Sequence, residues 1–469
     1  MELKNAWLSY TQEDRQRIGE LSQEYKSYLD KGKTEREFAE ISVKAAKAAG
    51  YRDLNEIIRS GGRIKSGDKV YAVWMEKTVA LFNIGSEPLE KGFNILGAHI
   101  DSPRLDLKQN PLYEDTELAY FDTHYYGGIK KYQWVALPLA IHGVIVRTDG
   151  TKIPVVLGED EDEPAFCITD LLIHLAQEQM EKKGAKVVEG ENLDLLIGSM
   201  PVKSSEEKEG DKKEKELVKN GVLKILKEKY GVEERDFESA ELEVVPAGKA
   251  RDAGLDSSMI LAYGQDDRVC SYASLRAFLD VKNVKTTAVC LLVDKEEIGS
   301  VGATGMRSRF FENTVFEILE LMDEKHTATE LTLRRVLANS RMLSSDVSAA
   351  YDPLYAARFD KRNAAYFGKG IVFNKFTGSR GKSGSNDTNA EFFAYVRSVM
   401  DGSKVAYQTA ELGKVDAGGG GTIAYIMALY GMDVVDCGMA VLSMHAPWEV
   451  TSKSDLYEGY KAYRAFIDR

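Results

Sequence analysis

The stretch TTAVCLLVDKEEIGSVGATG, residues 286–305, decides the fold class of this chain. Its first half is a short apolar run, typical of a buried strand. Two adjacent carboxylates, Glu296 and Glu297, follow the run, and the glycines after them let backbone approach closely. Open α/β sheets place their functional sites at the carboxyl ends of strands. The stretch therefore predicts an α/β sheet with a functional site where this strand ends.

Strand and helix patterns alternate on both sides of this stretch. Downstream, the pattern predicts a helix at 313–322 and a strand at 341–344. Upstream, a helix is expected at 35–49, and the apolar run NILGAH, residues 94–99, is a short strand that ends in a histidine. These elements suit an open sheet with helices around it. The expected fold class is therefore α/β.

Residues 105–244 have a different texture, with no clear cluster of catalytic residues. Strand-like runs such as 153–157 come first, and a helix is expected at 169–183. Residues 204–219 mix both charge signs without an apolar stripe, which favours an exposed loop or a solvated helix. The middle region is interpreted as an insertion into one α/β domain. The predicted domains are residues 1–104 plus 245–469, and residues 105–244.

Composition excludes several classes of function. The net charge of −12, from 62 basic and 74 acidic residues, argues against a nucleic-acid surface, which needs a basic face. The longest strongly apolar stretch, 134–146, is far shorter than the roughly 20 residues that span a bilayer. The N-terminal residues are polar and do not resemble a signal peptide. The 4 cysteines form no CxxC pair and are expected to be buried free thiols, so a cytoplasmic protein is expected.

Two of the 6 histidines lie where strands are expected to end. His99 closes the run NILGAH, and His445 follows an apolar segment near the end of the sequence. A histidine in such a place is more often packed or hydrogen-bonded than bound to a metal. The carboxylates elsewhere in the chain change that balance.

Two aspartates occupy comparable positions. Asp266 lies in GQDDR, just before an expected helix whose N-terminus favours anions, and it could be a simple helix cap. Asp346 follows a short apolar strand, where a turn aspartate is the plain alternative. Taken singly, neither residue establishes a site.

Together these residues form a coherent set of metal ligands. Two imidazoles and three carboxylates suit two divalent ions such as zinc, cobalt or manganese, with one aspartate bridging them. One glutamate is then left over for proton transfer. We expect Glu296 to act as the general base, taking a proton from the bridging water and delivering it to the leaving amine.

Five sequence blocks resemble one known family. GAHIDSPRLDLK, GQDDR, DKEEIGS, SSDVSAAYDP and SMHAPWEV occur in this order and spread over most of the chain. They are similar to the metal-site blocks of the aspartyl aminopeptidase and vacuolar aminopeptidase I family of dinuclear zinc exopeptidases. The resemblance implies a zinc-exopeptidase-like mixed sheet flanked by helices, an inserted β-rich dimerisation domain, and a homododecamer with active sites facing an inner chamber.

The resemblance also implies a role for each site residue. One ion would be held by His99, Asp346 and a bridging Asp266. The other would be held by Asp266, Glu297 and His445. Glu296 would be the base.

Two further residues acquire substrate-binding roles from the same resemblance. His174, in LLIHLAQ, corresponds to a histidine of the inserted domain that reaches into a neighbouring subunit's active site. Lys375 lies beside Asn374, which stands where aspartyl-specific members place a lysine, so the preference for an N-terminal Asp or Glu over a neutral residue stays open.

The expected function is metal-dependent removal of N-terminal residues from peptides. Two alternatives are a dinuclear amidase or deacylase that acts on small N-acyl compounds, and a non-enzymatic shell-forming protein with a vestigial metal site.

Overall fold

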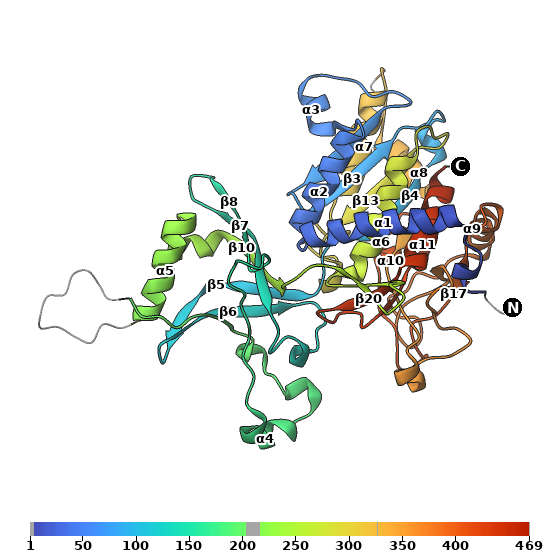
Figure 1. Cartoon of the computed structure of the whole chain (residues 1–469). Coiled ribbons are helices and arrows are strands. Elements are labelled where there is room, and N and C mark those ends of the chain that lie inside the picture. Colours follow the sequence, from blue (N-terminus) through green and yellow to red (C-terminus); the bar gives the residue numbers. More distant parts are fainter. Residues whose placement is uncertain (1–3, 203–215, 326, 469) are drawn as a thin grey trace, which may run out of the picture. The chain divides into compact units, whose positions relative to one another are not determined.

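The computed structural model describes residues 4–202, 216–325 and 327–468, and it divides into two units (Figure 1). The first unit comprises residues 1–102, 250–444 and 448–469, and the second comprises residues 103–249 and 445–447. The chain thus leaves the first unit after Ser102 and returns to it at Ala250. The prediction for segment 204–219 falls largely on residues 203–215, which lie outside the described residues.

A mixed sheet of nine strands, counted over the described residues, forms the centre of the first unit, in the order β1-β2-β3-β13-β4-β14-β18-β16-β17. The strands are β1 (Arg52–Asp53), β2 (Lys69–Trp74), β3 (Thr78–Asn83), β4 (Asn94–His99), β13 (Ala288–Val293), β14 (Arg341–Ser345), β16 (Ile371–Asn374), β17 (Tyr407–Thr409) and β18 (Asp433–Gly438). The neighbours β13, β4, β14 and β18 run parallel, whereas β3 and β16 run antiparallel to them. The carboxyl ends of four adjacent strands therefore meet at one end of the sheet.

Helices cover both faces of this sheet (Figure 1). Side chains of β13 alternate between the faces, with Cys290 in one apolar core and Val289 in the other, because successive strand residues point to opposite sides. The first core is covered by α1 (Gln12–Lys31), α2 (Glu35–Ala48), α6 (Gln265–Asp280), α9 (Ala390–Gly402) and α11 (Lys453–Ile467). The second is covered by α3 (Leu54–Arg59), α7 (Phe310–Met322), α8 (Glu330–Ala338) and α10 (Ala424–Ala428). The predicted α/β class, a mixed sheet flanked by helices, is confirmed.

A smaller sheet in the first unit supports the start of α6. Its strands follow the order β11 (Arg251–Ala253), β12 (Met259–Ala262), β20 (Glu449–Ser452), β19 (Ala440–Leu442) and β15 (Ser348–Ala349). The side-chain amide of Gln265, the first residue of α6, donates to the carbonyl oxygens of Ile260 and Glu449 at 3.1 and 2.7 Å. These bonds fix the helix end that precedes Asp266.

An antiparallel sheet forms the centre of the second unit, in the order β8-β7-β10-β5-β6-β9. The strands are β5 (Arg104–Asp115), β6 (Leu118–Tyr126), β7 (Leu139–Val146), β8 (Lys152–Leu157), β9 (Leu195–Gly198) and β10 (Ala240–Pro246), and the helices include α4 (Gln177–Met180) and α5 (Leu217–Tyr230). Buried side chains such as Leu139, Phe121 and Val244 form the interior of this unit.

The predicted helix at 169–183 is wrong. The segment contains only a 3-10 turn, η4 (Ile173–Leu175), and the four-residue helix α4. Leu172, Ile173 and Leu175 are 58%, 63% and 71% exposed. A short amphipathic helix gains most of its stability from packing its apolar face, and these side chains do not have that packing.

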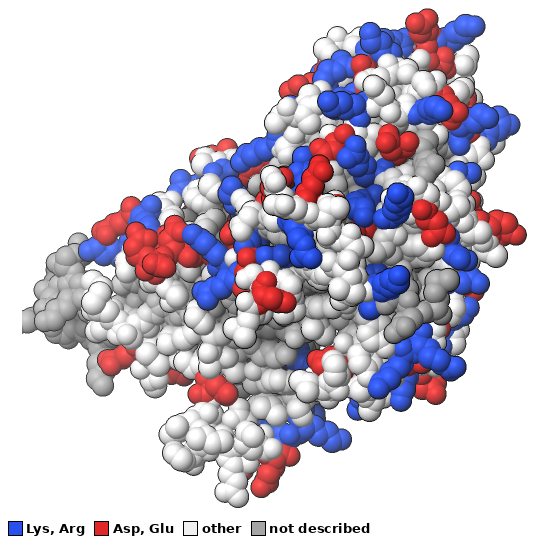
Figure 2. Space-filling model, turned by 45° about the vertical axis from the view of Figure 1, so that its right-hand side comes forward, with Lys and Arg blue, Asp and Glu red and all other residues white. Residues whose placement is uncertain are grey.

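Two further sequence predictions concern membrane-spanning segments and the state of the cysteines. None of the helices in the described ranges has the length and apolar character to cross a bilayer. The cysteines are free thiols, and Cys270, Cys290 and Cys437 are buried while Cys167 is partly exposed. On the face drawn in Figure 2, basic and acidic side chains are interspersed.

Candidate metal centre

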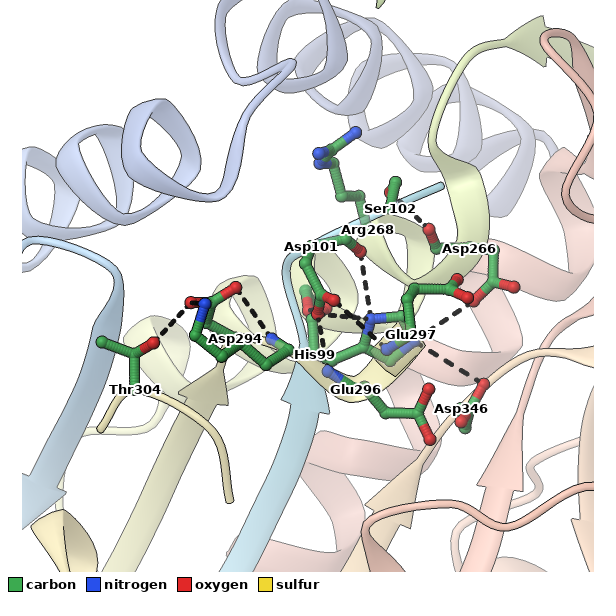
Figure 3. Close-up of polar contacts among 12 residues, drawn as sticks. His99, Asp101, Ser102, Asp266, Arg268, Asp294, Glu296, Glu297, Thr304 and Asp346 are labelled. Carbon is green, nitrogen blue, oxygen red and sulfur yellow. Dashed lines mark hydrogen bonds and ion pairs between the residues drawn. The ribbon is translucent and has the colours of Figure 1, made fainter. Parts of the chain in front are cut away.

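The ends of three parallel strands bring candidate ligands together (Figure 3). His99 is the last residue of β4 and pairs in register with Val293, the last residue of β13. Glu296 and Glu297 follow β13 after a two-residue turn, and Asp346 follows β14 directly. Residues nearly 250 positions apart in the sequence thus share one end of the sheet because their strands are neighbours.

The start of α6 contributes the fourth segment. Asp266 and Asp267 have non-helical backbone angles, and the peptide bond between them is cis. The amide of Asp266 donates to Glu449 Oε2 at 3.0 Å, and Ser102 Oγ donates to the carbonyl oxygen of Asp266 at 2.6 Å. These contacts fix the backbone of Asp266 from both sides.

The side chains of these segments form overlapping groups of donor atoms. Each group has its ligand atoms within 4.8 Å of one another. The groups are His99, Glu296 and Asp346; His99, Asp266 and Glu297; and Asp266, Asp267 and Asp346. The Nε2 atom of His99 lies 3.2 Å from Asp266 Oδ1 and 3.9 Å from Asp346 Oδ1.

Asp101 is a further residue of this cluster that the sequence pattern did not single out. The Nδ1 atom of His99 lies 3.1 Å from the carbonyl oxygen of Asp101, so an Nδ1–H donor would leave Nε2 facing the carboxylates. The buried Asp101 carboxylate also accepts hydrogen bonds from the amides of Glu296 and Glu297, at 3.1 and 3.2 Å. Its place two residues after a strand-ending histidine was the signal that could have found it.

The electrostatics of the site favour a cation. Burial raises the pKa of Asp346 well above its usual range, and repulsion from Glu296 adds to the rise. Burial likewise raises the pKa of Asp267, and Asp266 adds to it. Burial lowers the pKa of His99, but its hydrogen bonds to Asp101 and Asp266 outweigh that effect and raise it overall.

A divalent cation would relieve this repulsion and favour the ionised carboxylates. Carboxylate oxygen and imidazole nitrogen are also the donors that zinc binds. The residues present therefore fit a zinc-type centre.

His445 has a different setting. It lies in the stretch His445–Pro447, which belongs to the second unit, and its Nδ1 lies 2.8 Å from the carbonyl oxygen of Gly128. With Nδ1–H as donor, Nε2 would be the atom available to a metal. The donor groups found among the described residues do not include His445, and its role as a ligand stays a prediction.

The two residues predicted to bind substrate are exposed. His174 lies in η4, and Lys375 follows β16 directly. Asn374 is buried, and its side-chain amide donates to Ser348 Oγ at 3.0 Å. The substrate-binding roles of His174 and Lys375 stay predictions.

A histidine and paired carboxylates at the carboxyl ends of parallel strands, in a sheet covered by helices on both faces, define a metallohydrolase. The chain belongs to the aminopeptidase I zinc metalloprotease family (M18), whose model matches residues 28–467.

Individual relatives agree with this assignment. A probable M18 family aminopeptidase 1 from Clostridium acetobutylicum is 58% identical over 467 residues, which cover 100% of this chain and 98% of the relative. The crystal structure of an M18 aminopeptidase from Thermotoga maritima matches with a TM-score of 0.93 at 45% identity, covering 100% of this chain and 99% of that one. The mApe1 dodecamer from S. cerevisiae shares the fold, with a TM-score of 0.74 at 21% identity over 95% of each chain.

The protein is thus a metal-dependent aminopeptidase, a zinc metalloprotease that hydrolyses N-terminal residues from peptides. The predicted family, activity and enzyme class are confirmed.

Proposed function

We propose that this aminopeptidase holds two divalent ions bridged by Asp266 and uses Glu296 as its general base. The observation that carries the proposal is that Asp266 is a carboxylate shared by two groups. It belongs to one donor group with His99 and Glu297, and to another with Asp267 and Asp346. Asp346 is likewise shared by two donor groups, and the family resemblance assigns the bridging role to Asp266. A carboxylate with two oxygens can serve both groups, which supports a bridging position.

The family resemblance assigns the remaining ligands. His99 and Asp346 would complete the ligand set of one ion, and Glu297 and His445 that of the other. Bound ions supply a shared water of lowered pKa and a positive charge near the scissile carbonyl oxygen.

Glu296 then moves the proton. Its backbone amide donates to Asp101 at 3.1 Å. Its carboxylate belongs to one donor group with His99 and Asp346, and its charge adds to the raised pKa of Asp346, so it lies beside the proposed ligands. As the base it takes a proton from the attacking water and passes it to the nitrogen of the leaving amine. The free N-terminal amine of the substrate, which is cationic, is attracted by the same acidic cluster.

Two adjacent glutamates offer a matched test. Glu296→Gln should lower kcat by about 1,000-fold, within the range for a general base, while zinc content is unchanged. Glu297→Gln should instead lower the zinc content. Turnover is measured with aminoacyl-p-nitroanilides, and bound zinc by mass spectrometry. If Glu296→Gln hydrolyses these substrates at the wild-type rate, the assignment of the base is wrong.

The preferred first residue of the substrate is a second point for experiment. The exposed ammonium of Lys375 supports binding of an acidic side chain, while the neutral Asn374 is engaged with Ser348. A panel of Asp-, Glu-, Leu- and Ala-p-nitroanilides, repeated with Lys375→Met, distinguishes a preference for an acidic first residue from a preference for a neutral one. An acidic preference that Lys375→Met does not weaken would exclude this role of Lys375.

We also propose that the chain assembles into a homododecamer in which the second unit mediates dimerisation. The exposed apolar side chains of Leu172, Ile173 and Leu175 support an association surface, because such patches rarely face water in a monomer. His174 lies within this segment and would reach a neighbouring subunit's site. The mass of the assembly, measured by light scattering, tests the proposal, and a stable monomer would contradict it.

A cytoplasmic location is proposed from the free cysteines. Three of the free thiols are buried, and unpaired cysteines are typical of reducing compartments. Cell fractionation with an antibody to the chain is the corresponding test.

A further inference from the structure

Three consecutive backbone amides in the turn after β13 are held by buried carboxylates. Asp101 accepts from the amides of Glu296 and Glu297 at 3.1 and 3.2 Å. Asp294, fully buried at the end of the same strand, accepts from the amide of Lys295 at 2.7 Å. The turn that carries the proposed base is thus fixed from two sides, and Asp294 has no role in the chemistry described above.

Thr304 in turn holds Asp294 in place (Figure 3). Its hydroxyl donates to Asp294 Oδ2 at 2.5 Å, and its carbonyl oxygen accepts from the amide of Asp294 at 3.3 Å. That carbonyl also accepts from the hydroxyl of Thr78, in the neighbouring strand β3, at 2.5 Å. Thr304 is only 3% exposed. The threonine therefore ties the end of β13 to β3 through its hydroxyl and its carbonyl oxygen.

The turn needs such support because its backbone is unusual. Lys295 has φ 68°, a left-handed conformation that side chains with a Cβ atom rarely adopt. Its carbonyl oxygen accepts from the amide of Ser300 at 2.7 Å, which closes the turn, and Ser300 has φ 59°. Residues in this region persist only where surrounding contacts determine them. The hydrogen bond from the amide of Lys295 to the carboxylate of Asp294 is one of these contacts.

We propose that Asp294 and Thr304 are positioning residues for Glu296: they hold the turn at Lys295 so that the carboxylate of Glu296 reaches the attacking water. Asp101 fixes the amides of Glu296 and Glu297 from the ligand side, and the Asp294–Thr304 pair fixes the preceding residue from the sheet side. The inference rests on the proposed role of Glu296 as the base. A base must lie within hydrogen-bonding distance of the proton that it takes, so a small shift of the turn lowers the rate.

Thr304→Val tests this with little change in shape. Loss of the hydroxyl should lower kcat about 10-fold, since a displacement of about 1 Å can cost roughly 100-fold. KM and zinc content should stay within twofold of wild type, because the residue touches neither substrate nor ligand. Thr304→Ser keeps the hydroxyl and should restore kcat to within threefold.

Thr314→Val is the matched control. Thr314 is also buried in the first unit, and its hydroxyl donates to the carbonyl oxygen of Phe310 within α7 at 2.7 Å. It should lower the melting temperature about as much as Thr304→Val and leave kcat unchanged. A kcat for Thr304→Val equal to that of Thr314→Val would overturn the inference, and so would a loss of zinc specific to Thr304→Val.

A double variant separates this inference from the role of Glu296. In the Glu296→Gln background, Thr304→Val should lower the residual rate no further, because the threonine acts through the absent carboxylate. A further 10-fold loss would show that Thr304 acts elsewhere and would refute the positioning role. If Glu296→Gln alone keeps full activity, the proposed base fails first, and the inference fails with it.

Discussion

Each unit of this chain has one notable group of side chains placed against the usual preference, and the two groups differ in kind. The first unit buries charge, with His99, Asp101 and Asp267 almost wholly inaccessible at one end of its sheet. The second exposes apolar side chains, among them Ile173 and Leu175. Burying charge and exposing apolar surface both cost free energy, so we propose that each is a place where something else binds. In the first unit we expect a cation, and in the second another subunit.

Removal of metal should have the largest effect and should affect one unit only. Dialysis against a chelator should abolish peptidase activity, and zinc should restore it, since the site loses the charge that balances its carboxylates. Hydrogen exchange should rise in the peptide covering residues 294–300 and stay constant in β7 of the second unit. Equal loss of protection in both units would show that the difference between them does not concern metal.

Replacement of Asp101, which contacts both His99 and the amide of Glu296, should have the second-largest effect. Asp101→Asn should lower kcat/KM by about 10-fold to 100-fold, as expected for a group that orients a metal-binding histidine. Steady-state kinetics on an aminoacyl-p-nitroanilide measure the loss. Asp149→Asn, which alters an exposed carboxylate of the second unit bonded to the amide of Thr151 at 2.8 Å, should have no effect. If both variants have the same kcat/KM, Asp101 does not orient His99 for metal binding.

An exposed apolar residue of the second unit gives a smaller effect on a different measurement. Leu175→Asp should weaken assembly about 10-fold or more if this residue lies in an interface, and the folded subunit should remain. Analytical ultracentrifugation over a range of concentrations reports the change. Leu8→Asp alters an even more exposed leucine of the first unit and should leave the assembly intact. Assembly unaffected by Leu175→Asp would remove this segment from the interface.

The smallest effect concerns stability and pH. Burial raises the pKa of Asp436 to about 7, above the usual 3.8, so the folded state keeps a proton that the unfolded state has lost. Stability from this group is therefore lost as pH rises from about 4 to 7. Asp436→Asn does not titrate and should keep this stability. The free energy of unfolding of the variant minus that of the wild type should therefore rise by roughly 1 to 3 kcal/mol as the pH is raised from 5 to 8.

Denaturant titrations at several pH values measure this difference. Glu191→Gln, at an exposed carboxylate of the second unit whose pKa is lowered by its hydrogen bond to Lys108, should show no trend over that range. A flat difference for Asp436→Asn would mean that this carboxylate is ionised in the folded protein without cost.

Local pattern was enough to find part of the site. An apolar strand followed by paired glutamates predicted β13 and singled out Glu296 and Glu297, because strand period and strand ends are local properties. Asp266 and Asp346 were persuasive only as members of a set, since an aspartate near a helix start or a turn is common. The structure places these four carboxylates together with His99.

Other residues could not be found in that way. Asp101 accepts from the amide of Glu296, 195 positions away, and Thr304 holds Asp294, so the proposed roles of these residues depend on contacts that exist only in the folded chain. The predicted helix at 169–183 failed for a related reason. Its pattern was right for a helix, but a helix forms there only if something packs on its apolar face.

The central claim is that Asp266 bridges two ions at the end of the parallel strands. The most direct measurement is the number of zinc ions bound per chain, counted by native mass spectrometry for the wild type and for Asp266→Ala. We predict two ions for the wild type and none held tightly by the variant. One ion in the wild type, or two in Asp266→Ala, would contradict the account.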